Sequence, residues 1–285
     1  MSEINVGRVL IIAGSDSGGG AGIQADIKTC AAFGVYAATA ITAITAQNTL
    51  GVQSVEIMSP EIVRSQIRSV LDDIGADVIK IGMLANQAII EVVAEEIEDH
   101  NAYVVLDPVM IATSGDKLLD DGAIGALKEK LIPICDVITP NVPEAANLTG
   151  IEIEGVEDLS KAGQALVDMG AYAAVMKGGH LKGKTIVDVL ISEEENAVMT
   201  APYIRSRHTH GTGCTLASAI AANMALGAPL DEAVNAAREF VFEAIRSAPK
   251  LGKGNGPLNH GLVFKDEGGE SSADEGNPFA ILKDL

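Results

Sequence analysis

The residues best suited to chemistry lie in the stretch His208-Thr209-His210-Gly211-Thr212-Gly213-Cys214-Thr215, which precedes a run of small and apolar residues. Two glycines let a backbone turn tightly and approach a ligand closely. The run after them predicts a helix, whose first turn has amide N–H groups without intrahelical partners and the positive end of the helix dipole. Such a terminus binds anions, including a phosphoryl group in transfer, and lowers the pKa of a thiol at Cys214. The alternative interpretation is an ordinary loop before a helix.

Two uncharged side chains follow predicted strands. Gln47 comes directly after the β-rich run 37–46, and Met83 follows the strand predicted at 77–81. Ligands of open α/β sheets bind at the carboxyl ends of strands, and a glutamine there offers both a donor and an acceptor to an amide or heterocycle edge. The alternatives are a solvated turn for Gln47 and simple packing for Met83.

Charged side chains occupy equivalent positions. Asp107 follows the strand predicted at 103–106, where a buried carboxylate is costly unless it has a function. Lys177 ends a predicted strand and precedes two glycines, so its ammonium can reach a phosphate. Glu144 begins a helix after the proline-bracketed Asn141, and its carboxylate either complements the helix dipole at the surface or serves a metal ion.

The elements that position these residues alternate between strands and helices. At the amino end a strand at 8–13 is expected to stop at Gly14, a glycine loop follows, and a helix covers 23–33. Asp16 and Asp26 are the polar candidates of this loop for a substrate lip; the alternative is a flexible turn. Further strands are expected at 136–139, 173–177, 185–191 and 197–200, and further helices at 60–74, 87–99, within 117–131, from 144, at 158–169, after Gly213 up to Gly227, and at 230–247.

The composition indicates a globular α/β protein. Hydrophobic residues make up 47% of the chain and aromatic residues 3%, which suits helices packed on a buried parallel sheet. The formal net charge of -19 argues against nucleic acid or an anionic membrane as the main partner. Three widely spaced cysteines without a CxxC pair argue against a disulfide or zinc framework. Because Met1 to Ile4 lack the pattern of a signal peptide and no apolar run is long enough to cross a bilayer, a soluble cytoplasmic protein is expected.

No repeat or composition break divides the first 264 residues. We therefore expect one domain over residues 1–264, with compact structure ending near the glycine-rich run 252–257, and an acidic, mobile tail over 265–285.

Several short motifs occur in a family-specific order. They are Ala13-Gly-Ser-Asp-Ser-Gly-Gly-Gly-Ala-Gly-Ile-Gln-Ala-Asp26, Thr45-Ala-Gln-Asn48, Lys80-Ile-Gly-Met83, Leu106-Asp-Pro-Val109, Thr139-Pro-Asn-x-Pro-Glu144, Met176-Lys-Gly-Gly-His180 and Thr209-His-Gly-Thr-Gly-Cys214. In these motifs the chain resembles the bacterial hydroxymethylpyrimidine/phosphomethylpyrimidine kinases of thiamine biosynthesis, over about residues 8 to 264.

The resemblance implies a ribokinase-like three-layer sandwich, in which helices cover both faces of a mostly parallel sheet. It also implies ATP, Mg²⁺ and the phosphorylation of 4-amino-5-hydroxymethyl-2-methylpyrimidine and then of its monophosphate. The implied substrate contacts are a hydrogen bond from Gln47, ring packing by Met83, and Gly14, Asp26 and Val109. For the phosphates, the resemblance implies that Asp107 and Glu144 organise Mg²⁺ and that Lys177, Thr212 and Asn141 contact ATP. It also implies an anion hole at Gly211, Thr212 and Gly213. Cys214 is implied to face the hydroxymethyl group as the base.

Other functions remain open at this point. Pyridoxal kinases share the fold and the Gly-Thr-Gly-Cys turn, although Gln47 and Met83 favour the aminopyrimidine, because pyridoxal lacks the exocyclic amine. A non-catalytic pyrimidine-binding or regulatory protein would not need Asp107, Glu144, Lys177 and Cys214 together. Sugar kinases of the superfamily carry Asp where this chain has Cys214. We also expect a homodimer, with the small-molecule substrate and ATP as the other partners.

Overall fold

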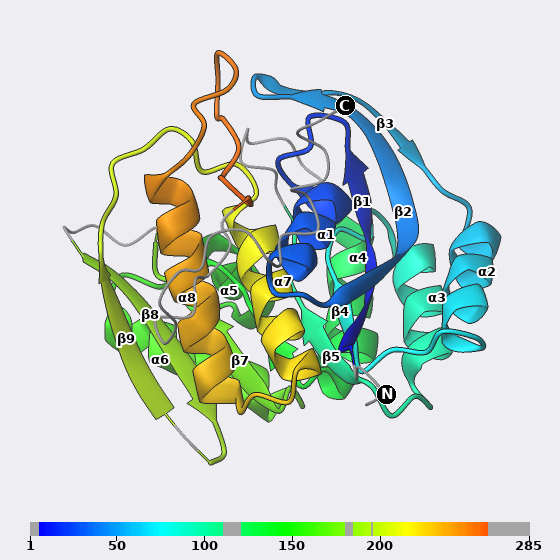
Figure 1. The fold of residues 1–285 in the computed structure, drawn as a ribbon. Coiled ribbons are helices and arrows are strands. Elements are labelled where there is room, and N and C mark those ends of the chain that lie inside the picture. The colour runs from blue at the N-terminus through cyan, green and yellow to red at the C-terminus, as the bar shows by residue number, and fades with distance from the viewer. Residues whose placement is uncertain (1–5, 111–120, 180–184, 195, 262–285) are drawn as a thin grey trace, which may run out of the picture.

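The computed structural model describes residues 6–110, 121–179, 185–194 and 196–261. Within these residues nine strands form one sheet, in the order β3-β2-β1-β4-β5-β6-β7-β8-β9 (Figure 1). The strands are β1 Arg8–Asp16, β2 Tyr36–Asn48, β3 Gly51–Ile57, β4 Val78–Ile81, β5 Tyr103–Leu106, β6 Val137–Ile138, β7 Ala173–Met176, β8 Thr185–Ser192 and β9 Asn196–Pro202. The helices are α1 Gly22–Ala32, α2 Pro60–Leu71, α3 Gln87–Ile97, α4 Asp121–Ala126, η1 Leu127–Leu131, η2 Ile132–Ile134, α5 Val142–Thr149, α6 Val156–Asp168, α7 Thr212–Ala225 and α8 Leu230–Arg246.

The centre of the sheet is parallel and both edges are antiparallel. Strands β2, β1, β4, β5, β6 and β7 run in the same direction, whereas β3, β8 and β9 join through antiparallel pairs. Because parallel strands place their carboxyl ends at one edge, the residues after β1, β4, β5, β6 and β7 gather there.

Alternating side chains of the sheet supply two hydrophobic cores. On β1, Leu10 and Ile12 pack in the core that α2, α3 and α6 cover. Val9 and Ile11 pack in the opposite core, which α1, α7 and α8 cover. Figure 1 shows α7 and α8 side by side on this second face. The period of two on a strand buried on both faces explains why its sequence is an unbroken apolar run.

Strand β1 is longer than the sequence predicted. It was expected to stop at Gly14 but continues to Asp16, after a shift in its pairing with β2 between Ala13 and Ser15. Asp16 is therefore paired with Thr45. The extension places Asp16 beside the end of β2, where Gln47 lies.

The sequence did not predict strand β3. It pairs antiparallel with the end of β2, and its Val55 and Ile57 are exposed. A strand that buries neither face has no alternating apolar pattern, so little in its sequence indicates it.

The compact structure extends beyond the predicted glycine-rich end. Leu258 and His260 are buried, and the Asn259 N–H donates to the Ala244 carbonyl at 3.0 Å. The prediction that packing ends at 252–257 was therefore wrong by a few residues. The predicted tail at 265–285 lies outside the described residues. In the part of the chain that is described, no helix combines the length and the apolar character needed to cross a membrane.

Candidate active site

A cavity of about 630 Å³ opens at the carboxyl edge of the parallel strands, a volume typical of small-molecule sites. All but one of the site residues proposed from the sequence line it: Gly14, Gln47, Met83, Asp107, Val109, Asn141, Glu144, Lys177, Gly211, Thr212, Gly213 and Cys214. Residues from the first and last thirds of the chain therefore meet in one cavity. Asp26 is the exception, because it does not line the cavity.

The start of α7 forms one part of the cavity wall. Gly211 is the N-cap and has a φ of 84°, which glycine adopts without strain. A Cβ at this position would also come within 1.9 Å of the Gly20 carbonyl oxygen, so the glycine loop and α7 touch through backbone alone. The helix then begins at Thr212, and its first turn faces the cavity through Gly213 and Cys214.

A charged group lies against this helix start. The Lys177 Nζ is 2.9 Å from Asp107 Oδ1 and 3.8 Å from Glu144 Oε2. Asp107 is buried after β5, and the Thr139 hydroxyl donates to it at 3.3 Å. A Cβ on Gly213 would lie 3.2 Å from the Lys177 Nζ and 3.4 Å from Asp107 Oδ2. The helix terminus, the ammonium and the carboxylate therefore face the same small space.

Glu144 has two roles, because it closes a capping box and lines the cavity. Its backbone N–H donates to Asn141 Oδ1 at 2.9 Å, and its carboxylate accepts the Asn141 N–H at 2.8 Å. Burial raises the pKa of Glu144 to about 7, Asp107 adds to the rise, and Lys177 opposes it. One lysine thus only partly compensates two buried carboxylates.

The Cys214 thiol does not have the lowered pKa expected at a helix N-terminus. Burial raises its pKa to about 12, and the negative charges of Asp26 and Asp107 add to this rise. The ammonium of Lys80 and a hydrogen bond from the Gly22 N–H lower it without cancelling the rise. Burial and the two carboxylates thus outweigh Lys80 and the Gly22 N–H, which favours the protonated thiol at neutral pH.

Asp26 lies beneath the cavity rather than at its surface. Its two carboxylate oxygens are 3.0 and 2.9 Å from the Lys80 Nζ, and the Ser218 hydroxyl donates to it at 2.7 Å. Asp26 and Lys80 are both fully buried. Burial raises the pKa of Asp26, and the Lys80 charge opposes that rise. The structure therefore gives Asp26 a bonding partner within the protein in place of the substrate contact implied by the resemblance.

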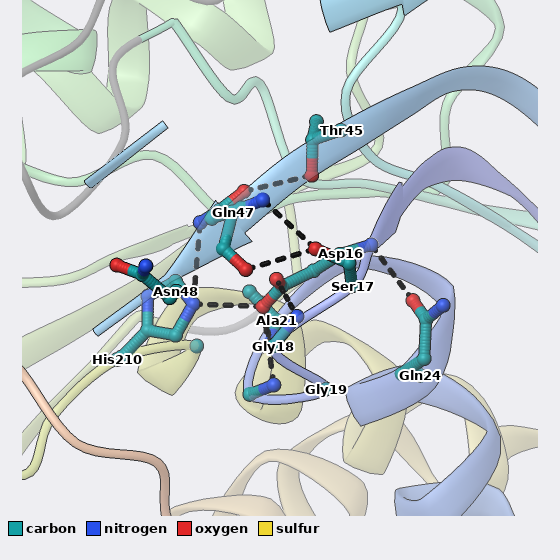
Figure 2. Close-up of polar contacts among 12 residues, drawn as sticks. Asp16, Ser17, Gly18, Gly19, Ala21, Gln24, Thr45, Gln47, Asn48 and His210 are labelled. Carbon is teal, nitrogen blue, oxygen red and sulfur yellow. Dashed lines mark hydrogen bonds and ion pairs between the residues drawn. The ribbon is translucent and has the colours of Figure 1, made fainter. Parts of the chain in front are cut away.

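Gln47 and Met83 line the cavity together with backbone from β1. A Cβ on Gly14 would lie 3.1 Å from the Met83 sulfur, so the absence of a side chain there leaves space beside the thioether. The Gln47 backbone is fixed by Ser17, whose hydroxyl accepts the Gln47 N–H at 2.8 Å. Figure 2 shows the Gln47 side chain between Thr45 and His210.

Another part of the cavity is mainly apolar. Its lining comes from β8, β9, the segment directly after β9, and α8, and includes Ile186, Ala201, Tyr203, Val241, Phe242 and Ile245. An aromatic base of a nucleotide requires a surface of this kind.

Sequence reasoning gave no role to three residues of the site. Lys80 appeared only inside a motif, because a lysine in a strand gives no sign of complete burial. His210 directly precedes the glycines of the α7 turn, but its contact with Asp16 joins residues that are 194 positions apart in the sequence. Arg238 lies on α8, lines the cavity and donates to Asp188 at 2.9 Å. Only the tertiary fold reveals these contacts.

Comparison with known proteins adds a family match. A sequence model of the family described as phosphomethylpyrimidine kinase matches residues 16–259. The hydroxymethylpyrimidine/phosphomethylpyrimidine kinase of Rhizobium meliloti is 48% identical over 254 residues, which are 88% of this chain and 96% of that protein.

Solved structures show the same fold. A phosphomethylpyrimidine kinase from Clostridium difficile superposes with a TM-score of 0.75 at 44% identity, covering 84% of this chain and 99% of that one. A pyridoxal kinase from Staphylococcus aureus, in complex with AMP-PCP and pyridoxal, gives 0.83 at 35% identity, covering 90% and 94%. These likenesses confirm the expected three-layer, ribokinase-like fold.

Proposed function

Because this chain belongs to the phosphomethylpyrimidine kinase family, we propose that it transfers phosphate from ATP to the hydroxymethyl group of 4-amino-5-hydroxymethyl-2-methylpyrimidine. We propose further that the same site phosphorylates the monophosphate to the diphosphate, as a step of thiamine diphosphate biosynthesis. The observation that carries the proposal is that Gln47 and Met83 line the same cavity as Lys177 and the α7 terminus. One cavity therefore combines groups that recognise a heterocycle with groups that bind phosphate.

The aminopyrimidine is assigned to the part of the cavity around Gln47. The amide side chain pairs with the amine-bearing edge of the ring, and Met83 packs on the ring face. Gly14 and Val109 line the same cavity and complete the contacts. This arrangement directs the hydroxymethyl group toward Cys214.

The transferred phosphate is assigned to the start of α7. The N–H groups of Gly213 and its neighbours, with the helix dipole, hold the phosphoryl oxygens. Lys177 contributes its ammonium, which lies 2.9 Å from Asp107 and 3.2 Å from the position that a Cβ on Gly213 would take. In-line phosphoryl transfer depends mainly on positioning and on neutralising charge, which these groups supply.

Asp107 and Glu144 fit a Mg²⁺ ion that accompanies ATP. Both carboxylates are buried and line the cavity, and burial raises the pKa of Glu144, to which the nearby charge of Asp107 adds. Mg²⁺ is commonly held by one or two carboxylates together with substrate phosphates, and when bound it neutralises phosphate charge. No group of three or more metal-ligating side chains occurs among the described residues, so the phosphates have to complete the ligand set.

Cys214 is assigned the position facing the hydroxymethyl oxygen. Because burial raises its pKa, the thiol is mainly protonated at pH 7.5. A loose transfer takes the alcohol proton late, so a base that is scarcely ionised in advance suffices. The thiol first releases its own proton to solvent in the cavity, and the thiolate, favoured by the Lys80 charge, then accepts the hydroxyl proton as the new O–P bond forms.

Pyridoxal is the second candidate substrate. The observation in its favour is that the pyridoxal kinase from Staphylococcus aureus superposes with a higher TM-score, 0.83, than the phosphomethylpyrimidine kinase from Clostridium difficile, at 0.75. Gln47 argues for the aminopyrimidine, since a site built for a hydrogen bond discriminates against a ligand that lacks the partner group.

We propose a homodimer formed through the β2–β3 hairpin. Its apolar side chains Ile44, Leu50, Val55 and Ile57 are 49%, 67%, 38% and 44% exposed. The strand register places Val55 and Ile57 on one face of the hairpin and Ile44 on the other, and exposed apolar side chains concentrated in one hairpin are typical of an interaction surface. Sedimentation velocity should give a dimer that Leu50→Lys dissociates; a wild-type monomer at micromolar concentration would refute this assignment.

Gln47→Leu tests the substrate assignment. The variant should retain its fold and lose about a hundredfold or more in kcat/KM on the aminopyrimidine, because a buried polar edge of the substrate is left unpaired. Gln164→Leu removes an exposed glutamine of α6 outside the cavity and serves as the matched control. Near-normal kinetics in the Gln47 variant would remove this residue from the site.

A further inference from the structure

The carboxylate of Asp16 is the fixed point of a polar cluster beside Gln47. It is buried and accepts N–H groups from Gly18 at 2.8 Å, Gly20 at 3.1 Å and Ala21 at 2.9 Å (Figure 2). These groups only donate, so the carboxylate is ionised and accepts at every contact. Burial raises the pKa of Asp16, but the hydrogen bonds from His210 and the loop outweigh it and hold the pKa below its usual value.

The tautomer of His210 follows from this carboxylate. The His210 Nε2 lies 2.8 Å from Asp16 Oδ2, and an ionised carboxylate cannot donate, so Nε2 carries the hydrogen. The ring is also fixed in place. A Cβ on Gly20 would lie 2.6 Å from the His210 Cδ2, so the ring packs closely against this loop. The backbone N–H of His210 also donates to the Gly256 carbonyl at 3.1 Å.

The Gln47 amide directs its nitrogen, a hydrogen-bond donor, at this protonated nitrogen of His210. Its Nε2 lies 3.3 Å from the His210 Nε2, so two donors face each other. At the other end its Oε1 lies 3.1 Å from the Thr45 hydroxyl. That hydroxyl has one hydrogen, and the Ser15 carbonyl at 2.9 Å is the closer acceptor and can only accept. The hydroxyl therefore has a lone pair, not a hydrogen, for Gln47.

Turning the amide by half a rotation removes the conflict between two donors. Its oxygen then faces the His210 Nε2–H and shares that hydrogen with the closer Asp16 Oδ2, and its nitrogen donates to Thr45 Oγ1. The contact with His210 and the contact with Thr45 independently favour the same orientation of the Gln47 amide. Which atom of an amide is nitrogen is decided by such networks.

We propose that His210, anchored by Asp16, is a positioning residue that fixes the orientation of the Gln47 amide and thereby sets which heterocycles the site accepts. In this orientation one N–H and one lone pair of the amide remain for the ligand, in a fixed order. The inference rests on the proposed function, in which Gln47 reads the substrate ring.

The order of donor and acceptor distinguishes two chemically similar ligands. A 4-aminopyrimidine presents an N–H donor beside an accepting ring nitrogen. Its 4-oxo analogue presents a carbonyl acceptor beside a ring N–H, which is the reverse order. A fixed amide pairs fully with one of them, whereas an amide free to turn pairs with either. We infer that His210 enforces the preference for the 4-amino order.

The test compares the 4-amino alcohol with its 4-oxo analogue. Wild-type protein should prefer the 4-amino compound in kcat/KM by about a hundredfold or more. His210→Phe should narrow this ratio by about tenfold or more, mainly through KM. His210→Gln, whose amide can still donate to Gln47, should restore most of the ratio. Calorimetric binding of both compounds without ATP should show the same changes in Kd.

Perturbing the other end of the amide gives a second test should His210→Phe not fold. Thr45→Val removes the acceptor for the Gln47 nitrogen with almost no change of shape and should also narrow the ratio. Thr29→Val is the matched control, because the Thr29 hydroxyl is equally buried and donates to the Ala25 carbonyl away from Gln47. In a Gln47→Leu background, His210→Phe should cause no further change of the ratio, since its effect passes through Gln47.

The outcomes separate the two proposals. A wild-type protein that neither binds nor phosphorylates the 4-amino alcohol overturns the proposed function and this inference with it. A selective wild-type protein whose ratio is unchanged in both His210→Phe and Thr45→Val overturns the inference alone. A ratio that falls equally in Thr29→Val would also overturn it, because loss of selectivity would then follow from general loosening.

Discussion

Breaking the buried ion pair beneath the cavity should strongly lower the free energy of unfolding. Asp26→Ala removes a carboxylate whose two oxygens are 3.0 and 2.9 Å from the Lys80 Nζ, with both residues fully buried. It leaves an ammonium in the interior without its partner and the Ser218 hydroxyl without its acceptor.

Breaking such a pair typically costs about 3–5 kcal/mol, a large part of a total stability on the order of 5–15 kcal/mol. With a urea m-value of about 3 kcal/mol/M, the unfolding midpoint should fall by roughly 1–1.7 M. The double variant Asp26→Leu/Lys80→Met removes both charges and keeps the volume filled. Because paired charges also cost desolvation, it should lie within about 1–2 kcal/mol of the wild-type protein.

Equilibrium urea unfolding followed by circular dichroism measures all three proteins. We expect strongly non-additive changes in the free energy of unfolding, with the single variant much less stable than the double variant. If Asp26→Ala lost less than about 1 kcal/mol, or if the double variant were the less stable of the two, the Lys80 charge would not be held mainly by Asp26.

Three further predictions concern the cavity and its surroundings. Cys214→Ser should lower kcat by about ten- to ten-thousandfold, the range for a lost base. Because burial raises the thiol pKa to about 12, iodoacetamide should alkylate Cys214 slowly at pH 7.5 and faster as the pH rises, and fast alkylation at pH 7 would refute the protonated thiol. Gly213→Val should lower kcat on the order of a hundredfold in a folded chain, because the side chain crowds the Lys177 Nζ, 3.2 Å from the position of the Cβ; unchanged turnover would show that this space is not used. Burial lowers the pKa of His260 to about 4, so the unfolded chain binds a proton below about pH 6.5 that the folded chain binds only near pH 4. Stability should therefore decrease as the pH falls through this window, and His260→Gln should flatten the decrease in a urea series; an equal slope in the variant would exclude His260 as its source.

Local patterns were sufficient to predict most of the fold. The expected limits of β5 and α8 agree with the structure within a residue or so, because a buried apolar run and an amphipathic stripe are local signals. Strand β3 was missed because its side chains bury no face. The extension of β1 to Asp16 was missed because glycine and polar residues at a strand end resemble a turn, while pairing with β2 keeps them extended.

The sequence predicted which residues line the cavity better than it predicted their pKa values. Asp107, Lys177 and Gln47 each follow or end a strand, so their meeting at one edge follows from topology. The pKa of Cys214 was predicted in the wrong direction, since the helix dipole can be inferred from sequence but burial and the Asp26 charge cannot. For the same reason the internal bonding of Asp26 to Lys80 was not foreseen.

The most direct test of the proposed function is a coupled ADP-release assay of the purified full chain with ATP and Mg²⁺, in which 4-amino-5-hydroxymethyl-2-methylpyrimidine and pyridoxal are compared at equal concentration. The account predicts turnover of the aminopyrimidine, a monophosphate and then a diphosphate product by phosphorus NMR, and a kcat/KM at least about tenfold above that for pyridoxal. A preference for pyridoxal, or no phosphorylation of the aminopyrimidine, would contradict it.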